Sequence, residues 1–194
     1  MPFSLMDIAV QRYGHRGSLW ITRFRFITLG GMKVAAVQLT STGNITENQE
    51  IALAKIREAA GNGARLIVMP EATSQNFRSG RLDEQAQSLE GPFATAIQAL
   101  AEELEVTVVA GMFCPADTVE RDGKTINRVS NTALIAGPGV LGGYDKIHTY
   151  DAFDYRESDT VLAGESLVAF DVDDLVVGVA TCYDIRFPEQ FKEL

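Results

Sequence analysis

Three reactive side chains each come at the end of an apolar segment that is typical of a buried strand. Glu71 follows residues 66–70, Lys146 closes another such segment, and Cys182 follows residues 175–181. In α/β proteins, ligands tend to bind beyond the carboxyl ends of the strands. If the fold brings the three side chains together there, they supply a proton acceptor, a cation and a nucleophile. Whether they meet depends on the order and direction of the strands.

Cys182 lies between a predicted strand and the polar segment 183–189, as a nucleophile does on a sharp strand-to-helix turn. A free thiol is only a few per cent ionised at neutral pH, so a catalytic cysteine needs a base or a cation beside it. The alternative is a buried thiol with a structural role, which is the commoner fate of an isolated strand-end cysteine. Cys114, between Phe113 and Pro115, has no comparable surroundings, and we predict a structural role for it.

Glu71 and Lys146 have the chemistry that such a nucleophile needs. A glutamate can accept the thiol proton and pass it to a leaving amine, and a lysine can stabilise the oxyanion of a tetrahedral intermediate. Taken alone, each also fits a solvated residue, as an exposed loop carboxylate and a strand-end ammonium. His148 suggests a Cys–His pair, but its side chain shares the direction of Lys146 only if the strand continues through it. We therefore interpret His148 as a structural or supporting residue.

Short apolar strands alternate with helices along the chain, which indicates an α/β fold. Thr46 to Gln49 match a capping box at the start of the first helix, and Pro92 is typical of the first turn of the second. A long polar connection runs from His148 to about Glu165. The predicted strands are 33–39, 65–69, 106–113, 131–136, 140–146, 167–172 and 175–181, and the predicted helices are 46–60 and 92–104.

The chain is predicted to hold one domain, residues 32–194, preceded by an extension, residues 1–31. The extension is basic, whereas the remainder is acidic. A secretion signal is not favoured, because Arg23 and Arg25 interrupt its apolar residues. Met32 opens a clean strand and has the appearance of a natural start. We predict that the extension is a disordered tail or an artefact of an upstream start site.

Composition narrows the classes of partner. The 194 residues include 17 Lys and Arg against 26 Asp and Glu, for a net charge of −9, which argues against nucleic acid and anionic membranes as partners. No apolar run approaches the roughly 18 residues of a spanning helix. Two cysteines cannot form a disulfide framework, and no metal-binding or phosphate-binding motif is present. We predict a cytoplasmic protein that takes a small molecule and uses no metal.

Taken together, three segments resemble the nitrilase superfamily of carbon–nitrogen hydrolases. They are Pro70-Glu71, Lys146-Ile147-His148 and the run CYDIRFPE, residues 182–189, in the order in which the family has them. The resemblance covers residues 32–194. The segment 144–164 together with the cysteine run is most similar to the amidase branch that includes deaminated-glutathione amidase and ω-amidase.

The resemblance implies a fold and a reaction. The fold is an α-β-β-α sandwich that assembles into homo-oligomers. The cysteine attacks an amide or a nitrile and forms a thioester or thioimidate that water resolves, without metal or organic cofactor. Glu157 inherits the role of a second glutamate that positions substrate or base, and the backbone N–H of Tyr183 completes the oxyanion hole with Lys146. The expected reaction is hydrolysis of a small linear amide with release of ammonia.

The same resemblance raises alternatives. Family members continue well past the cysteine, so we expect a sandwich that is incomplete at its C-terminus. A chain that acts only in assembly with another subunit, without turnover, is therefore a second hypothesis. An acyltransferase or a glutamine-hydrolysing module, which use the same cysteine chemistry, is a third.

Overall fold

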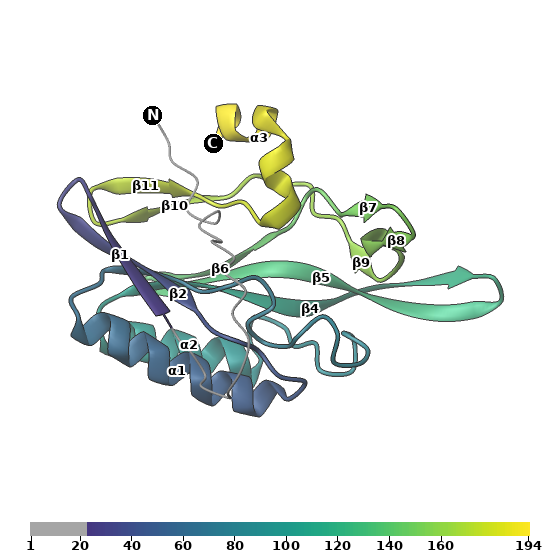
Figure 1. The fold of residues 1–194 in the computed structure, drawn as a ribbon, viewed down its shortest axis with the longest axis horizontal. Coiled ribbons are helices and arrows are strands. Elements are labelled where there is room, and N and C mark those ends of the chain that lie inside the picture. The colour runs from purple at the N-terminus through teal and green to yellow at the C-terminus, as the bar shows by residue number, and fades with distance from the viewer. Residues whose placement is uncertain (1–22) are drawn as a thin grey trace, which may run out of the picture.

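The structure is a computed structural model that describes residues 23–194. These residues form a central mixed sheet with helices on one face and a small second sheet on the other (Figure 1). The elements in chain order are β1 (Arg23–Leu29), β2 (Met32–Gln38), α1 (Ile45–Gly61), β3 (Leu66–Val68), α2 (Pro92–Glu103), β4 (Thr107–Arg121), β5 (Lys124–Gly137), β6 (Val140–Asp145), β7 (Asp151–Ala152), β8 (Tyr155–Arg156), the 3₁₀ helix η1 (Glu157–Asp159), β9 (Val161–Leu162), β10 (Ala169–Val172), β11 (Leu175–Gly178), the 3₁₀ helix η2 (Cys182–Arg186) and α3 (Pro188–Glu193).

Strand direction in the central sheet decides which loops meet. The strand order is β1-β2-β3-β4-β5-β6, with β9 beside β5. Strands β2, β3 and β4 are parallel, β5 is antiparallel to β4, and β6 is antiparallel to β5. Strand β6 therefore runs in the same direction as β3. The segments that follow β3 and β6 therefore leave the sheet at the same end of its strands. These segments carry Glu71 and Lys146.

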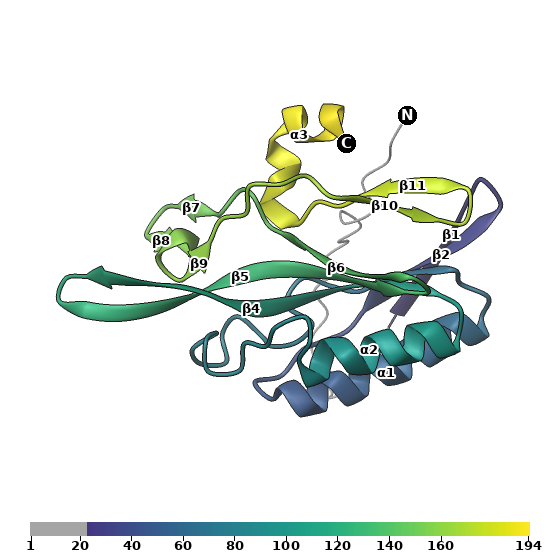
Figure 2. The same cartoon turned by 180° about the vertical axis from the view of Figure 1, so that it is seen from behind.

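Two apolar cores hold the layers together. On one face, α1 and α2 bury residues spaced four apart, Ala52 and Ile56 on one helix and Phe93 and Ile97 on the other. On the opposite face, strands β2, β3, β4, β5 and β6 pack against Phe170 and the rest of the β10–β11 hairpin. Helix α3 lies beyond this hairpin in both views (Figures 1 and 2). The predicted layered α/β fold is confirmed.

The N-terminal boundary differs from the prediction. Residues 23–29, assigned to a disordered extension, form strand β1, which pairs antiparallel with β2 at the sheet edge. Gly30 and Gly31 make the turn with positive φ values of 54° and 93°, which glycine adopts without a steric penalty. The predicted disorder is wrong for residues 23–31, because Arg23 and Arg25 alternate with apolar residues as in an edge strand. The alternative of an upstream start site stays a prediction. The remainder of the predicted extension, residues 1–22, lies outside the described residues.

The start of α1 also differs from the predicted capping box. The helix begins at Ile45, and its N-cap is Asn44. The Asn44 side-chain oxygen accepts hydrogen bonds from the backbone N–H groups of Thr46 and Glu47, at 2.9 and 3.2 Å. An asparagine in extended conformation satisfies these free amides well, so the helix starts one residue before the threonine that was predicted to cap it.

Strands β4 and β5 are much longer than predicted and form an arm that extends beyond the body of the sheet (Figure 1). Asp122 and Gly123 make its turn with φ values of 51° and 70°, which is the conformation that a two-residue hairpin favours. An ion pair between Arg121 and Asp159 joins the tip of the arm to the last residue of η1. The polar connection predicted between the hairpin and β10 contains β7, β8, η1 and β9.

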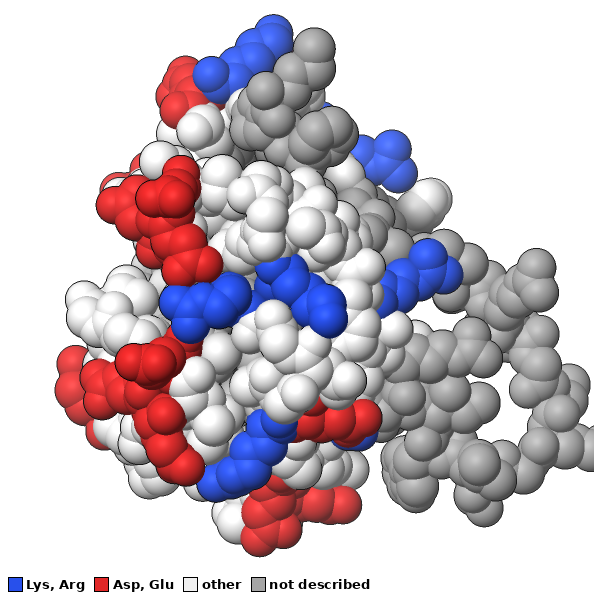
Figure 3. Space-filling view, turned by 90° about the vertical axis from the view of Figure 1, so that its left-hand side faces the viewer, with Lys and Arg blue, Asp and Glu red and all other residues white. Residues whose placement is uncertain are grey.

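The end of the molecule that holds the β1–β2 and β10–β11 turns carries both signs of charge (Figure 3). Arg65, just before β3, pairs there with Asp173 in the β10–β11 turn at 2.8 Å. Both side chains are exposed, so this pair contributes little stability, but it links the two sheets. No helix within residues 23–194 is long and apolar enough to cross a membrane.

Candidate active site

Glu71 is held at the sheet edge by backbone pairing between the segment after β3 and strand β4. The Gly111 N–H donates to the Pro70 carbonyl at 3.1 Å, and the Ser74 N–H donates to the Gly111 carbonyl at 3.0 Å. Ala72, next to Glu71, has a φ of 58°. Such left-handed backbone costs roughly 1–3 kcal/mol in a non-glycine residue and persists only where its surroundings fix it. The Glu71 carboxylate is thereby presented from a rigid turn.

A glycine is required opposite this turn. A Cβ at Gly111 would lie 2.5 Å from Ala72 N and 2.7 Å from Glu71 Cα. Backbone atoms cannot rotate away as a side-chain end can, so we expect Gly111→Ala to lower the free energy of unfolding by about 1–3 kcal/mol. The matched control is Gly142→Ala in β6, where a Cβ meets nothing within 4 Å. Urea unfolding checks the pair; equal midpoints for the two variants would contradict the prediction.

Lys146 lies just past the end of β6, and its side chain points toward the carboxylates of Glu71 and Glu157. Its backbone N–H donates to the Asn131 carbonyl at 2.9 Å. Its side chain is only 2% exposed, and Nζ contacts the two carboxylate oxygens of Glu157 at 2.8 and 2.9 Å and Glu71 Oε1 at 3.4 Å. Burial lowers the pKa of Lys146, but the charge of Glu71 and the hydrogen bonds and charge of Glu157 outweigh it, so the pKa is raised. Lys146 is therefore a fixed cation.

Glu157 is the first residue of η1 and is 3% exposed. The loop that carries it folds back on itself, because the Glu157 N–H donates to the Tyr150 carbonyl at 3.1 Å and the Tyr150 N–H donates to Glu157 Oε2 at 2.6 Å. The carboxylate thus has a backbone partner as well as Lys146. A buried charge is tolerated only with such pairing, so this arrangement fixes the ammonium of Lys146.

Asn131 was missed by the sequence reasoning. It is 1% exposed at the start of the apolar part of β5, and its Nδ2 donates to Glu71 Oε1 at 2.7 Å and to Glu157 Oε1 at 3.4 Å. With its carbonyl bound to the Lys146 N–H, this one residue contacts three of the predicted site residues. Nothing in the sequence around Asn131 distinguishes it from any polar residue at a strand start.

Cys182 opens η2 directly after Thr181 and has a φ of 51°. A cysteine in this left-handed conformation is strained and marks a sharp strand-to-helix turn. The residue is exposed, yet packing removes water from around its sulfur. This desolvation, the charge of Glu71 and a hydrogen bond to Glu71 raise the pKa of Cys182 to about 11, and the charge of Lys146 opposes the shift. The resting group is therefore a thiol, beside the charges of Glu71 and Lys146.

The four side chains predicted from the sequence therefore lie together, from three different loops. The charges of Glu71 and Lys146 both act on the Cys182 thiol, Glu71 lies 3.4 Å from Lys146 Nζ, and Lys146 Nζ lies 2.8 Å from Glu157. Among the described residues 23–194, no group of His, Cys, Asp and Glu side chains is arranged to hold a metal ion. The arrangement can deprotonate a sulfur nucleophile and stabilise negative charge beside it.

The carbon–nitrogen hydrolase family model matches residues 33–193. The chain belongs to the carbon–nitrogen hydrolase family. The match covers every site residue described above, and it begins after β1, so this strand precedes the region that the family shares.

Relatives of this chain are named as hydrolases and amidases. A Mycobacterium tuberculosis protein described as a hydrolase is 41% identical over 168 residues, which are 84% of this chain and 56% of that protein. Deaminated glutathione amidase of Synechocystis sp. is 34% identical over 168 residues, 82% of this chain and 60% of that one. Omega-amidase NIT2 of Danio rerio is 31% identical over 164 residues, which are 81% of this chain and 56% of that protein. The chain thus spans less than two thirds of the length of these relatives.

Solved structures agree with the fold. Nit3 of Saccharomyces cerevisiae, a member of branch 10 of the nitrilase superfamily, is 25% identical with a TM-score of 0.65, over 82% of this chain and 58% of that one. A second structure is a mutant amidase of Nesterenkonia sp. AN1, in which acrylamide has added to the active-site cysteine. It has a TM-score of 0.66 at 18% identity, over 82% of this chain and 60% of that one. The nitrilase-type arrangement of sheet and helices is therefore present in this chain.

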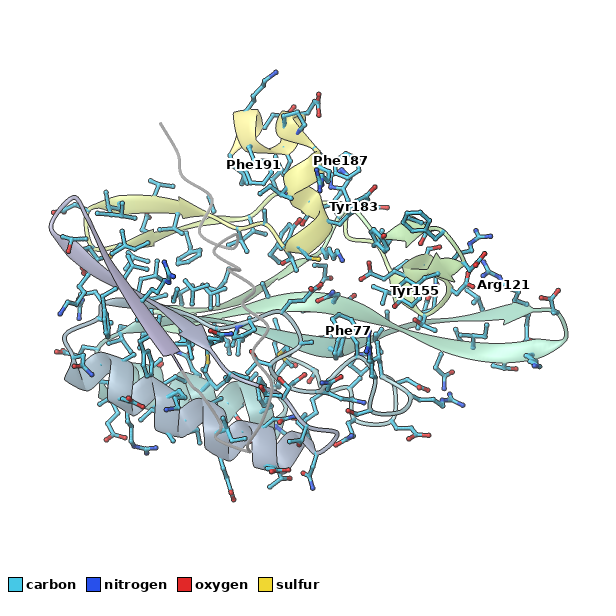
Figure 4. The ribbon with its side chains drawn as sticks, viewed as in Figure 1. Phe77, Arg121, Tyr155, Tyr183, Phe187 and Phe191 are labelled. Carbon is cyan, nitrogen blue, oxygen red and sulfur yellow. The ribbon has the colours of Figure 1, made fainter. Side chains whose placement is uncertain are left out.

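Aromatic rings lie beside the site. The ring of Tyr183, next to the nucleophile, contacts Tyr150 edge-on with centroids 5.0 Å apart and Phe187 at 5.5 Å. The Tyr150 ring lies 6.4 Å from that of Tyr155, whose pKa is raised by burial and then by the charge of Glu157. Figure 4 shows Tyr155 and Tyr183 on neighbouring segments above strands β4 and β5. These rings form one aromatic cluster that begins at the residue next to Cys182.

His148 does not pair with the thiol in the way a Cys–His dyad would. Its Nδ1 lies 2.8 Å from Asp184 Oδ1, and its ring stacks on Phe187 with centroids 3.5 Å apart. Cys114, for which a structural role was predicted, is half-buried against the helix-side core, and burial raises its pKa. Neither residue contributes to the cluster around Cys182.

Proposed function

We propose that this hydrolase cleaves a small linear amide through a thioester on Cys182, with release of ammonia. The observation that carries the proposal is the ion pair of the Lys146 ammonium with Glu71 Oε1, at 3.4 Å, beside the Cys182 thiol, whose pKa both groups shift. A thiol with a raised pKa does not attack unless its proton is removed, and Glu71 is the carboxylate that acts most strongly on this thiol and can take its proton.

In the first half of the proposed reaction, Glu71 accepts the thiol proton as the sulfur attacks the amide carbon. The carbonyl oxygen becomes an oxyanion, which the Lys146 ammonium and the backbone N–H of Tyr183 stabilise. The tetrahedral intermediate collapses, the carbon–nitrogen bond breaks, and Glu71 returns the proton to the leaving nitrogen. Ammonia departs and a thioester remains on Cys182.

In the second half, water takes the place of ammonia. Glu71 accepts a proton from the water as its oxygen attacks the thioester carbon. The carbon–sulfur bond breaks, the carboxylic acid leaves, and the proton returns to the Cys182 sulfur. Glu157 holds the Lys146 ammonium in place through both halves. The amidase names of the relatives favour an amide over a nitrile as the substrate.

The proposal is tested by ammonia release from a panel of small ω-amides, with Cys182→Ser beside the wild-type chain. Loss of the nucleophile is expected to lower the rate at least about 10³-fold. Cys114→Ser is the matched control and is expected to keep the wild-type rate, since Cys114 lies outside the cluster. Equal rates for the wild-type chain and Cys182→Ser would overturn the proposal. A folded wild-type chain that releases no ammonia would favour the assembly role instead.

A further inference from the structure

The carboxylate of Asp184 is fully buried between the loop that carries Lys146 and the turn that carries Cys182. Its side chain is 0% exposed. Oδ2 accepts a hydrogen bond from the Tyr144 hydroxyl at 2.6 Å, and Oδ1 accepts one from the His148 N–H at 2.9 Å and contacts His148 Nδ1 at 2.8 Å. Tyr144 and His148 flank Lys146 by two residues on each side. Asp184 therefore holds the segment on both sides of Lys146 in place through hydrogen bonds.

The same carboxylate holds the turn of the nucleophile. The Thr181 N–H donates to Asp184 Oδ2 at 2.8 Å, and the Asp184 N–H donates to the Thr181 carbonyl at 3.1 Å. Thr181 and Asp184 form a reciprocal capping box around η2. Cys182, with its left-handed φ, lies inside this box. Strained backbone persists where its surroundings over-determine it, and the box supplies that constraint.

A second layer of contacts fixes the partners of Asp184. The Tyr144 hydroxyl accepts hydrogen bonds from Gln190 Nε2 at 2.9 Å and from the Ile147 N–H at 3.3 Å. The hydroxyl therefore donates its single proton to Asp184. Burial and this carboxylate raise the pKa of Tyr144. Through Gln190, helix α3 joins the same network.

We propose that Asp184 is a positioning residue that sets the placement of the Cys182 sulfur relative to Lys146 and Glu71. This role rests on the proposed function, in which those groups act together, but Asp184 touches neither the sulfur nor the ammonium. Four hydrogen bonds from two segments that are distant in sequence converge on one carboxylate, and each segment carries a group of the reaction. A displacement of about 1 Å at such a site can cost about 100-fold in rate.

The test compares Asp184→Asn with the exposed β10 variant Asp171→Asn. An amide has one acceptor oxygen and cannot accept at both former oxygen positions, so the N–H donors of Thr181 and His148 cannot both be satisfied. We expect kcat for amide hydrolysis to fall about 100-fold in Asp184→Asn, with KM changed less than about threefold, and no change in Asp171→Asn. A folded Asp184→Asn variant with wild-type kcat would overturn the proposal.

A second readout needs no substrate. The pH at which alkylation of Cys182 by iodoacetamide is half-maximal reports the thiol pKa, which Glu71 raises more than Lys146 lowers it. Displacement of the sulfur should therefore move this inflection to lower pH in Asp184→Asn. A purely structural role would lower the urea midpoint and leave the inflection of the folded protein unchanged, which would overturn the proposal.

Tyr144→Phe keeps the test decisive if Asp184→Asn does not fold. It removes one of the hydrogen bonds to Asp184 and keeps the carboxylate and the ring. We expect kcat to fall about tenfold with little change in KM, and the alkylation inflection to move in the same direction as in Asp184→Asn. An unchanged kcat and inflection would overturn the proposal. If the wild-type chain hydrolyses no amide, the proposed function fails, and the alkylation inflections alone decide the role of Asp184.

Discussion

Replacing Glu71 with glutamine is expected to change two reactivities of Cys182 in opposite directions. After burial, the negative charge of Glu71 is the largest cause that raises the pKa of Cys182 to about 11. Glutamine removes that charge, so the thiol pKa falls. Below the pKa, each unit of decrease raises the thiolate fraction about tenfold, so alkylation by iodoacetamide at pH 8 becomes faster. Amide hydrolysis slows about 10²–10⁴-fold, because glutamine accepts no proton.

The matched control is Glu189→Gln, which makes the same change of charge on an exposed residue at the start of α3. It should leave both rates near those of the wild-type chain. Alkylation rates between pH 7 and 11 and ammonia release from the same preparation give the two quantities. If Glu71→Gln slowed alkylation as well as hydrolysis, the prediction would be wrong, because the charge of Glu71 would then not be what limits the thiolate fraction. An unchanged rate of hydrolysis would rule out Glu71 as the base.

The main features of the site could be predicted because local patterns carry them. Glu71 and Lys146 follow strands β3 and β6 of the central sheet, and a strand has only two directions in a sheet. Cys182 follows the separate β10–β11 hairpin, whose last strand ends at Gly178. Once β6 runs with β3, the ends of both strands meet at one edge. The turn at Cys182 was also visible as a change from an apolar to a polar segment. Short-range patterns and the residue types therefore made these three positions candidates, and the order of the three segments, through the resemblance, selected them.

Two hairpins that the sequence analysis did not predict are marked by turn residues. Asp122-Gly123 is a two-residue hairpin signal, and it lies at the tip of the β4–β5 arm. Gly30-Gly31 makes a similar turn between β1 and β2. In both cases charged residues on the flanking strands hid the alternation, because an exposed strand needs no apolar face. In both hairpins the turn residues, and not an apolar run, are therefore the signal that predicts the strands.

The supporting residues could not be predicted, because their partners are distant in the sequence. Asn131 reaches Glu71 across 60 positions, and Tyr144 reaches Asp184 across 40. A single polar residue on a buried strand carries no local pattern that names its partner. The need to satisfy a buried polar group explains why such residues occur, but only the folded arrangement shows which groups satisfy them.

Replacing Lys146 with methionine is expected to remove both stability and turnover. The ammonium is the cation that compensates Glu157, which is 3% exposed and has the Tyr150 N–H and Asn131 as its other hydrogen-bond donors. Loss of one partner from a buried pair leaves an uncompensated charge and costs about 3–5 kcal/mol. Urea unfolding should show this loss for Lys146→Met. The control Lys55→Met breaks a surface pair with Glu58 and should cost no more than about 1 kcal/mol.

The double variant Lys146→Met/Glu157→Gln separates the two roles of the lysine. Glutamine at 157 removes the stranded charge, so the double variant should recover most of the stability that Lys146→Met loses. It should not recover hydrolysis, because no cation remains to stabilise the oxyanion. Recovery of stability without activity would assign the ammonium to the chemistry as well as to the fold. If the double variant regained turnover together with stability, Lys146 would serve only to neutralise Glu157, and the oxyanion would have to rely on backbone N–H groups alone.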